Sequence, residues 1–347
     1  MGLLQRFILN VFIGFAVLLS GCAAVTQDAG NNYEFKGSAG TRESLAAEPS
    51  RTADRTITLG FSQLGTESDW RNANTASIKD AAKEAEIRLI FENAEQSQEQ
   101  QFQAVRSFIR QKVDVIAIAP VVEKGWEPIL REARQAGIPV ILVDRLAEVS
   151  DTSLYTALIG SDFYEEGRKA GKFVVDKVKN VPGPVGIAEL KGTAGSAPSI
   201  GRGDGFREIV RNHSDLAILE SAVGNFTFEE GKEAMRSILK ARGAEVRVLF
   251  SHNDDMALGA IEAIEEYGLS PGKDIVIVSV DGTRRALVNL EKGKLNYVVE
   301  CNPLLGPNLM QAVKELMRGR TLPKRILTPE TVFTEATPAA ELANRKY

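Results

Sequence analysis

Three acid–base side chains stand together in "SHNDDMALGA", residues 251–260, where His252 is followed by Asn253, Asp254 and Asp255. Such a group could hold a metal ion, transfer protons in catalysis, or bind a ligand at the end of a strand. Zinc sites favour cysteine and histidine ligands, and the chain has only two residues of each type. A strand-to-helix turn would also aim the two aspartates differently, so we expect no metal here.

The two aspartates also have a simpler interpretation, because acidic side chains cap helices and favour their first turn. We expect Asp255 to be the capping residue of a helix that begins here, whereas Asn253 and Asp254 are the candidates for ligand contact. The adjacent His252 then needs no chemical role.

Asp144 and Asp281 raise the question of catalysis, because glycoside hydrolysis needs two carboxylates that flank the scissile bond. Both aspartates end apolar runs, "VILVD" and "IVSVD". Each has neighbours that favour its charged form, so the sequence gives no sign of a proton donor. We therefore expect no enzyme and no catalytic residue. Asp144 beside Arg145 is either a ligand contact or a structural ion pair.

The glycine-rich segment 191–205, "KGTAGSAPSIGRGDG", precedes a helical pattern. It lacks the Gly-Lys-Ser/Thr of a phosphate-binding loop, so we expect no nucleotide cofactor. Arg202 in this segment either binds ligand or packs a flexible loop. Gly167 and Gly171, spaced four residues apart, indicate close packing between helices.

These polar residues are positioned by short β-branched runs that alternate with longer amphipathic stretches. Strands alternating with helices are typical of βαβ units and parallel sheets, and continuous apolar runs indicate strands buried on both faces. The number of units exceeds one open sheet, so we predict two doubly wound α/β lobes. The expected strands are 55–61, 87–92, 113–120, 138–144, 154–162, 183–190, 217–223, 246–252, 274–281 and 295–301. The expected helices are 69–86, 97–112, 126–136, 164–179, 200–212, 228–242, 255–267 and 304–318.

Open α/β sheets bind ligands beyond the carboxyl ends of their strands, which is where the unusual polar residues stand. Their types suit a polyhydroxylated ligand, because carboxylates accept, guanidinium groups donate, and amides do both. Aromatic rings can cover the C–H face of a sugar. The candidates by type are Asp144, Asp254 and Asp281; Arg145 and Arg202; Asn253 and Asn302; and Phe61, Trp70 or Phe226.

The N-terminus has the pattern of a secretory signal, with Arg6 before an apolar run over 7–19. The run is short for a transmembrane helix. It ends in Leu-Ser-Gly-Cys, which resembles a bacterial lipobox, so we expect Cys22 to carry lipid and 1–22 to be the signal segment. Small and polar residues then favour a flexible tether over 23–54.

The remaining composition excludes other classes. The formal net charge is -4, so no basic field favours nucleic acid. If Cys22 is lipidated, Cys301 is alone, and we expect it to be a small buried hydrophobe. The body must therefore be stabilised by its core.

The body over about 56–335 resembles the periplasmic sugar-binding proteins of the ribose/galactose type, which serve ABC importers. It is most similar to the galactofuranose-binding proteins. The resemblance rests jointly on "GFSQLGTESDWR", "AVRSFIRQKVDVIAIAPVVEKGWEP", "VDR", "GKE", "HNDDM", "PGKDI" and "SVDG". It implies that sugar contacts come from Ser62, Gln63, Glu67, Trp70, Arg71, Asp144, Arg145, Arg202, Asn253 and Asp281.

The same resemblance implies two discontinuous lobes, 55–161 plus 303–328 and 162–302 plus 329–347, joined by three chain crossings and closing around a sugar. Together with the lipobox, it implies a lipid-anchored, extracytoplasmic monomer that passes a monosaccharide to an inner-membrane permease. Presentation of the sugar to a chemoreceptor or sensor kinase remains an alternative. A LacI-type regulator shares this core but needs a helix-turn-helix before it, where this chain has the signal and tether. Asp69, Gly201, Pro198 and Cys301-Asn302 depart from the family pattern.

Overall fold

The computed structural model describes residues 55–337 and 344–347. The expected signal segment, the lipidated Cys22 and the tether therefore lie outside the described residues. Among the residues described, no helix is long and apolar enough to cross a bilayer.

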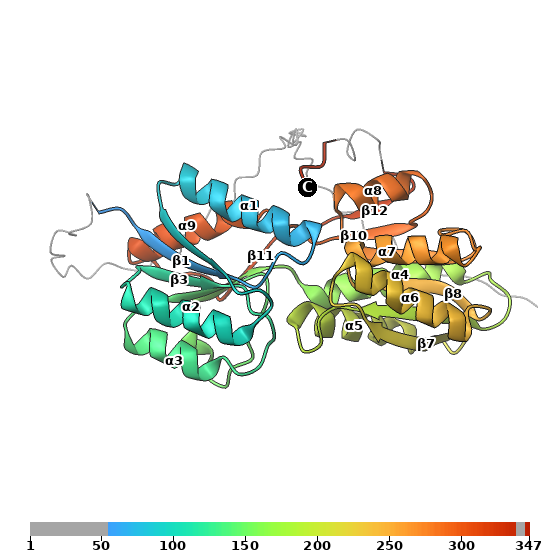
Figure 1. Cartoon of the computed structure of the whole chain (residues 1–347), viewed down its shortest axis with the longest axis horizontal. Helices are drawn as coiled ribbons and strands as arrows, with labels where there is room; N and C mark the ends of the chain where they lie inside the picture. The colour runs from blue at the N-terminus through green and yellow to red at the C-terminus, as the bar shows by residue number, and fades with distance from the viewer. Residues whose placement is uncertain (1–54, 338–343) are drawn as a thin grey trace, which may run out of the picture. The chain divides into compact units, whose positions relative to one another are not determined.

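The first sheet consists of parallel strands in the order β11-β5-β4-β3-β1-β2. Its central strands are buried along their whole length, because helices cover both faces (Figure 1). The strands are β1 (Thr58–Gln63), β2 (Arg88–Asn93), β3 (Val115–Ile118), β4 (Val140–Val143), β5 (Ala157–Gly160) and β11 (Arg325–Leu327). The helices are α1 (Asp69–Glu84), α2 (Gln98–Arg110), α3 (Glu127–Gln135), the 3₁₀ turn η1 (Thr152–Leu154) and α9 (Gly306–Met317).

The second sheet has the order β12-β10-β9-β8-β6-β7, in which only β12 is antiparallel to its neighbour. Its two faces carry separate apolar clusters, one with α6 to α8 and one with α4 and α5. The strands are β6 (Val185–Lys191), β7 (Leu216–Val223), β8 (Val246–Ser251), β9 (Val276–Asp281), β10 (Tyr297–Glu300) and β12 (Val332–Thr334). The helices are α4 (Phe163–Val178), α5 (Ala197–Val210), α6 (Phe228–Arg242), α7 (Asp254–Glu266) and α8 (Arg284–Glu291).

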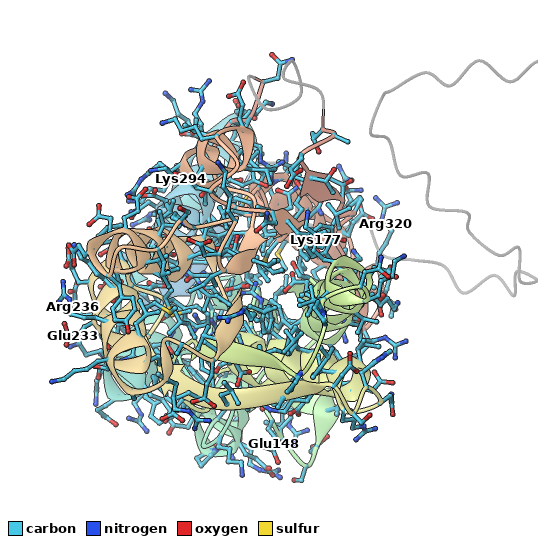
Figure 2. The ribbon with its side chains drawn as sticks, turned by 90° about the vertical axis from the view of Figure 1, so that its right-hand side faces the viewer. Glu148, Lys177, Glu233, Arg236, Lys294 and Arg320 are labelled. Carbon is cyan, nitrogen blue, oxygen red and sulfur yellow. The ribbon has the colours of Figure 1, made fainter. Side chains whose placement is uncertain are left out.

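The chain passes between the sheets at three places: after β5, after β10 and after β11. Each sheet thus takes strands from separate parts of the sequence. This confirms the predicted fold of two doubly wound parallel lobes. Charged side chains lie at the surface of the second lobe, among them the paired Glu233 and Arg236 (Figure 2).

Side-chain caps define where the helices nearest the strand ends begin. Ser68 accepts from Arg71 N at the start of α1, and Asn253 accepts from Met256 N at the start of α7. Capping oxygens of this kind satisfy backbone donors that have no partner inside the helix. The loops after β1 and β8 are thereby held in one conformation at the edge of each sheet.

The packing of α4 against α5 depends on glycine. A Cβ on Gly167 would lie 2.1 Å from Arg202 O, and one on Gly205 would lie 2.0 Å from Tyr164 O. The two backbones can therefore approach only because both positions lack side chains. This close contact places Arg202 at the carboxyl edge of the second sheet, in agreement with the expected packing role of Gly167.

Candidate functional site

One pocket, with about 280 Å³ of space not filled by atoms, lies where the carboxyl ends of the two sets of strands meet. The first lobe supplies residues from the loop after β1, from α1 and from the end of β4. The second lobe supplies residues from α5, from the loops after β7 and β8, and from the ends of β9 and β10. The lining residues are Glu67, Ser68, Trp70, Arg71, Asp144, Arg145, Pro198, Arg202, Phe226, Asn253, Asp281 and Cys301.

The first lobe contributes a buried network of two acids and two guanidinium groups. Arg71 donates through Nη2 to Asp144 Oδ2 at 2.7 Å and through Nε to Glu67 Oε1 at 3.2 Å. Arg145 donates to Val121 O at 3.1 Å and stays 3.7 Å from Asp144 Oδ2. Burial, together with repulsion by Arg71, lowers the pKa of Arg145 to about 10. An extra acceptor near Arg145 would therefore be bound favourably.

The second lobe presents Arg202, whose guanidinium group is oriented by three partners. Nε donates to Glu166 Oε2 at 2.7 Å, Nη1 donates to His252 O at 2.5 Å, and Nη2 lies 3.6 Å from Asp281 Oδ1. Burial alone would lower the pKa of Arg202, but the charges of Glu166 and Asp281 and the hydrogen bond to Glu166 act together with Cys301 to raise that pKa. Arg202 is thus a fixed cation, held by an acid that does not line the pocket.

Two aromatic side chains enclose the pocket. Trp70 reaches from the first lobe and donates through Nε1 to Cys301 O at 2.6 Å. Phe226 lies in the second lobe with its ring centroid 5.2 Å from Arg145 Cζ. Its position requires Gly192, because a Cβ there would meet the ring at 1.8 Å. These rings supply apolar faces beside a set of charged groups, which is the combination that a sugar ring needs.

The pocket also contains polar atoms that have no partner. Glu67 Oε2, Arg71 Nη1 and Arg145 Nε are buried, and no hydrogen bond reaches them. A buried polar atom without a partner costs about 1–3 kcal/mol. Hydroxyl groups, which both donate and accept, would satisfy the carboxylate oxygen and the two guanidinium nitrogens together.

Four of the residues expected to contact ligand do not line this pocket. Ser62 Oγ is buried without a partner, and Gln63 donates to Asn74 and Thr75 inside the first lobe. Asn302 accepts from Leu304 N at 2.9 Å, which stabilises the turn before α9. The fourth residue is Asp254. Each of the four is near a pocket residue in the sequence, but its side chain points away from the pocket.

Asp254 holds the loop between β9 and α8 rather than a ligand. Its carboxylate accepts from Ser279 Oγ at 2.5 Å, Gly282 N at 2.8 Å and Thr283 N at 2.7 Å. Burial raises the pKa of Asp254 to about 6 in spite of these bonds. Its role is to fix the loop that follows Asp281.

The expectation that Asp255 caps α7 is wrong, because the N-cap is Asn253. Asp255 instead accepts from the backbone N–H of Asp69 in the first lobe, at 3.1 Å. His252 is fully buried, with Nε2 3.1 Å from Glu189 Oε1. These neighbours in sequence thus face different parts of the molecule, as a strand-to-helix turn requires.

Four residues at the site were missed. Ser68, Pro198 and Cys301 line the pocket, and Glu166 orients Arg202 from the first turn of α4. Only Ser68 had a signal, as a serine directly before a helical pattern. Three ligand-type atoms of Glu166, Cys301 and Glu330 also lie within 4.8 Å of one another, and His252 is not part of this group.

The sequence family decides the class of this pocket. The profile described as "Periplasmic binding protein domain" matches residues 59–321. The chain belongs to the periplasmic binding protein family. Members are substrate-binding proteins, not enzymes, and they act outside the cytoplasm.

Relatives of this binding protein cover most of its length. It is 40% identical to the galactofuranose-binding protein YtfQ of Escherichia coli, over 87% of this chain and 95% of the relative. It is 34% identical to the fructose import binding protein FruE of Bifidobacterium longum, over 83% of this chain and 87% of the relative. The binding protein is therefore a sugar-binding component of the ABC importer type, similar to the galactofuranose-binding proteins.

Solved structures agree with this assignment. A protein from Mycobacterium smegmatis in complex with β-D-fucofuranose is 49% identical, with a TM-score of 0.82 over 83% of this chain and 95% of that one. The arabinose ABC transporter component from Shewanella sp. ANA-3, bound to α- and β-L-arabinofuranose, is 46% identical, with a TM-score of 0.80 over 84% and 96%.

Proposed function

We propose that this protein captures a monosaccharide in its furanose form, of the galactofuranose type, and delivers it to an ABC permease. The observation that carries the proposal is the set of unpaired buried atoms on Glu67, Arg71 and Arg145 at one pocket. A furanose has hydroxyl groups around a small ring, which suits a pocket with charged groups on both lobes. The furanose ligands named for two similar structures support the choice of ring form.

In this proposal each lobe has a distinct task. Glu67, Arg71, Asp144 and Arg145 of the first lobe bind hydroxyl groups, while Trp70 and Phe226 cover the apolar face of the ring. Arg202, Asn253 and Asp281 complete the site when the second lobe closes. We propose lobe boundaries at 161/162, 302/303 and 328/329, where the chain passes from one sheet to the other. Closure would exclude water and strengthen each charge-assisted bond.

The lipid anchor is part of the same proposal. A lipidated Cys22 followed by a tether over 23–54 would keep the body near the membrane that holds the permease. Stable anchoring takes about two acyl signals, which bacterial lipoprotein processing normally supplies. We further propose that the protein acts as a monomer, with no cofactor.

A thermal-shift panel tests the proposed ligand class. The protein is heated with galactose, L-arabinose, ribose, glucose or methyl β-D-galactofuranoside, and an Asp144→Ala variant serves as the control. A ligand at about 100 times its dissociation constant adds about 2.7 kcal/mol to the free energy of unfolding. We expect a shift with the galactofuranoside that is at most about half as large in the variant, because a tenfold weaker affinity leaves about 1.4 kcal/mol at the same concentration. Shifts only with ribose or glucose would contradict the galactofuranose assignment, and no shift with any sugar would contradict the function.

A further inference from the structure

A small cluster beside the pocket joins the two lobes without lining the pocket itself. Asp255 Oδ2 of α7 accepts from the backbone N–H of Asp69 at 3.1 Å. Arg285 of α8 donates to Asp69 Oδ2 at 3.2 Å and lies 3.8 Å from Asp255 Oδ1. Asp69 belongs to the first lobe, whereas Asp255 and Arg285 belong to the second.

The backbone N–H of Asp69 is one of the donors that a helix leaves without an internal partner. Ser68 already satisfies Arg71 N at the same end of α1, and Asp255 satisfies a second donor from the opposite lobe. The two residues that follow Asp69, Trp70 and Arg71, both line the pocket. A contact that fixes this turn therefore fixes the pocket as well.

We propose that Asp255 is a positioning residue for ligand binding, which fastens the first turn of α1 to the second lobe when the lobes are together. This inference rests on the proposed function, because it concerns closure around the sugar. Asp255 does not line the pocket, so it acts through Trp70 and Arg71.

The surroundings of Asp255 give the contact a pH dependence. The carboxylate is buried in the closed arrangement and faces the acids Asp69 of α1, Asp254 of its own helix and Asp281 of β9. The cation of Arg285 partly offsets them. Burial, followed by repulsion from Asp69, raises the pKa of Asp255 to about 7. With α1 moved away, the repulsion from Asp69 is lost and the carboxylate gains contact with water, so that pKa falls.

Proton linkage sets the direction in which pH changes the closure of the lobes. The closed form binds a proton at Asp255 more tightly than the open form, so lower pH favours closure. Asp255 has a pKa of about 7 in the closed form, but in the open form it does not titrate between pH 6 and pH 8. The affinity for sugar is therefore about tenfold lower at pH 8 than at pH 6. The protonated acid still accepts from Asp69 N through its carbonyl oxygen, so the contact itself survives.

The decisive variant is Asp255→Asn, which keeps the acceptor for Asp69 N and removes the titration. We expect its affinity for methyl β-D-galactofuranoside to be the same at pH 6 and pH 8, whereas that of wild type falls about tenfold, so the advantage of the variant over wild type grows about tenfold between the two pH values. A gain of affinity cannot arise from a folding defect. Asp69→Asn, which removes the repelling acid and keeps the backbone donor, should also flatten the pH profile.

The matched control is Asp274→Asn. Asp274 also accepts from a backbone N–H, that of Ser270 at 2.7 Å, but within its own lobe. Its pH profile should equal that of wild type. The affinities are measured by isothermal titration calorimetry on the full chain. Equal profiles for wild type and Asp255→Asn would overturn the proposal.

A readout without sugar separates the two proposals. Small-angle scattering of the unliganded full chain should give a smaller radius of gyration at pH 6 than at pH 8 for wild type, and no such difference for Asp255→Asn. If wild type binds no sugar at either pH, the proposed function fails and the scattering result alone decides. Identical scattering changes in both proteins would then reject the role of Asp255.

Discussion

Asp144 and Asp281 occupy equivalent places in the two lobes, and both have backbone angles that L-residues rarely adopt. Asp144 follows β4 with a φ of 64°, and Asp281 ends β9 with a φ of 126°. β4 is the third strand from the β11 edge of the first sheet, and β9 is the third strand from the β12 edge of the second sheet. Each carboxylate faces an arginine, with Arg71 Nη2 at 2.7 Å from Asp144 and Arg202 Nη2 at 3.6 Å from Asp281.

Each of these backbone conformations stores about 1–3 kcal/mol of strain. It persists only where the packing and hydrogen bonds of the surrounding structure hold it in place. The strain turns each carboxylate from the line of its strand to the pocket, where it meets a guanidinium group. A ligand in the pocket would therefore find each acid with its guanidinium partner already oriented.

Replacing Asp144 should weaken sugar binding. Asp144→Ala leaves Arg71 and Arg145 as buried cations with one acid, Glu67, between them. We expect the affinity for methyl β-D-galactofuranoside, measured by calorimetry, to fall more than tenfold, because a buried charged donor loses its acceptor. The control is Asp151→Ala, which breaks a surface ion pair with Arg134. An unchanged affinity would remove Asp144 from the site.

Glu330 should make the stability of the protein depend on pH. Its Oε1 accepts from Ser161 Oγ, from Asn302 N at 3.3 Å and from Thr328 Oγ1 at 3.3 Å. It thus ties together all three passages between the lobes. Burial, followed by repulsion from Glu166, raises the pKa of Glu330 to about 8.

The folded protein therefore keeps a proton on Glu330 that the unfolded chain releases near pH 4.3. Stability from this group is complete below that pH and is lost as the pH rises to about 8, by at most about 1.4 kcal/mol per unit. Glu330→Gln keeps an acceptor and should show a shallower fall of Tm between pH 5 and pH 8. Parallel Tm curves for the two proteins would contradict the raised pKa.

The close packing of α4 and α5 predicts a strong effect of one methyl group. Gly167→Ala places a Cβ 2.1 Å from Arg202 O, so the helices must separate. We expect a loss of about 1–3 kcal/mol in the free energy of unfolding, as for other overpacked sites, together with weaker sugar binding because Arg202 moves. Denaturant titration measures the first effect and calorimetry the second. Asp176→Ala, at an exposed position of α4, should change neither.

Lipidation is tested at Cys22. Cys22→Ala removes the thiol that would carry the diacylglyceryl group, so we expect an unprocessed precursor without label when cells are grown with a radioactive fatty acid. Cys301→Ala is the matched control, because that thiol is buried in the folded body. Acyl label on the Cys22→Ala variant would refute the lipobox.

Much of the fold and part of the site could be predicted from local patterns. β3 and β4 are apolar runs, "VIAI" and "VILV", and burial on both faces leaves such runs few alternatives to a central parallel strand. Because parallel strands end at one edge, the polar residues that follow them, such as Asp144 and Arg145, were expected at one pocket, and both line it. Among the described residues, the only strands that the sequence did not predict are β11 and β12. Each has three residues, which is too few to show an alternating or apolar pattern.

The sequence by itself thus determined the two-lobed fold, most of the strand ends that line the pocket, and the sugar class of the ligand. The tertiary structure alone decided which side chain of each strand end faces the pocket. Asp254 and Asp255 are neighbours, yet one fixes a loop of its own lobe and the other reaches Asp69, 186 residues away in the chain. No local pattern encodes such a choice, because it depends on which unpaired donors the docked elements bring within about 3 Å.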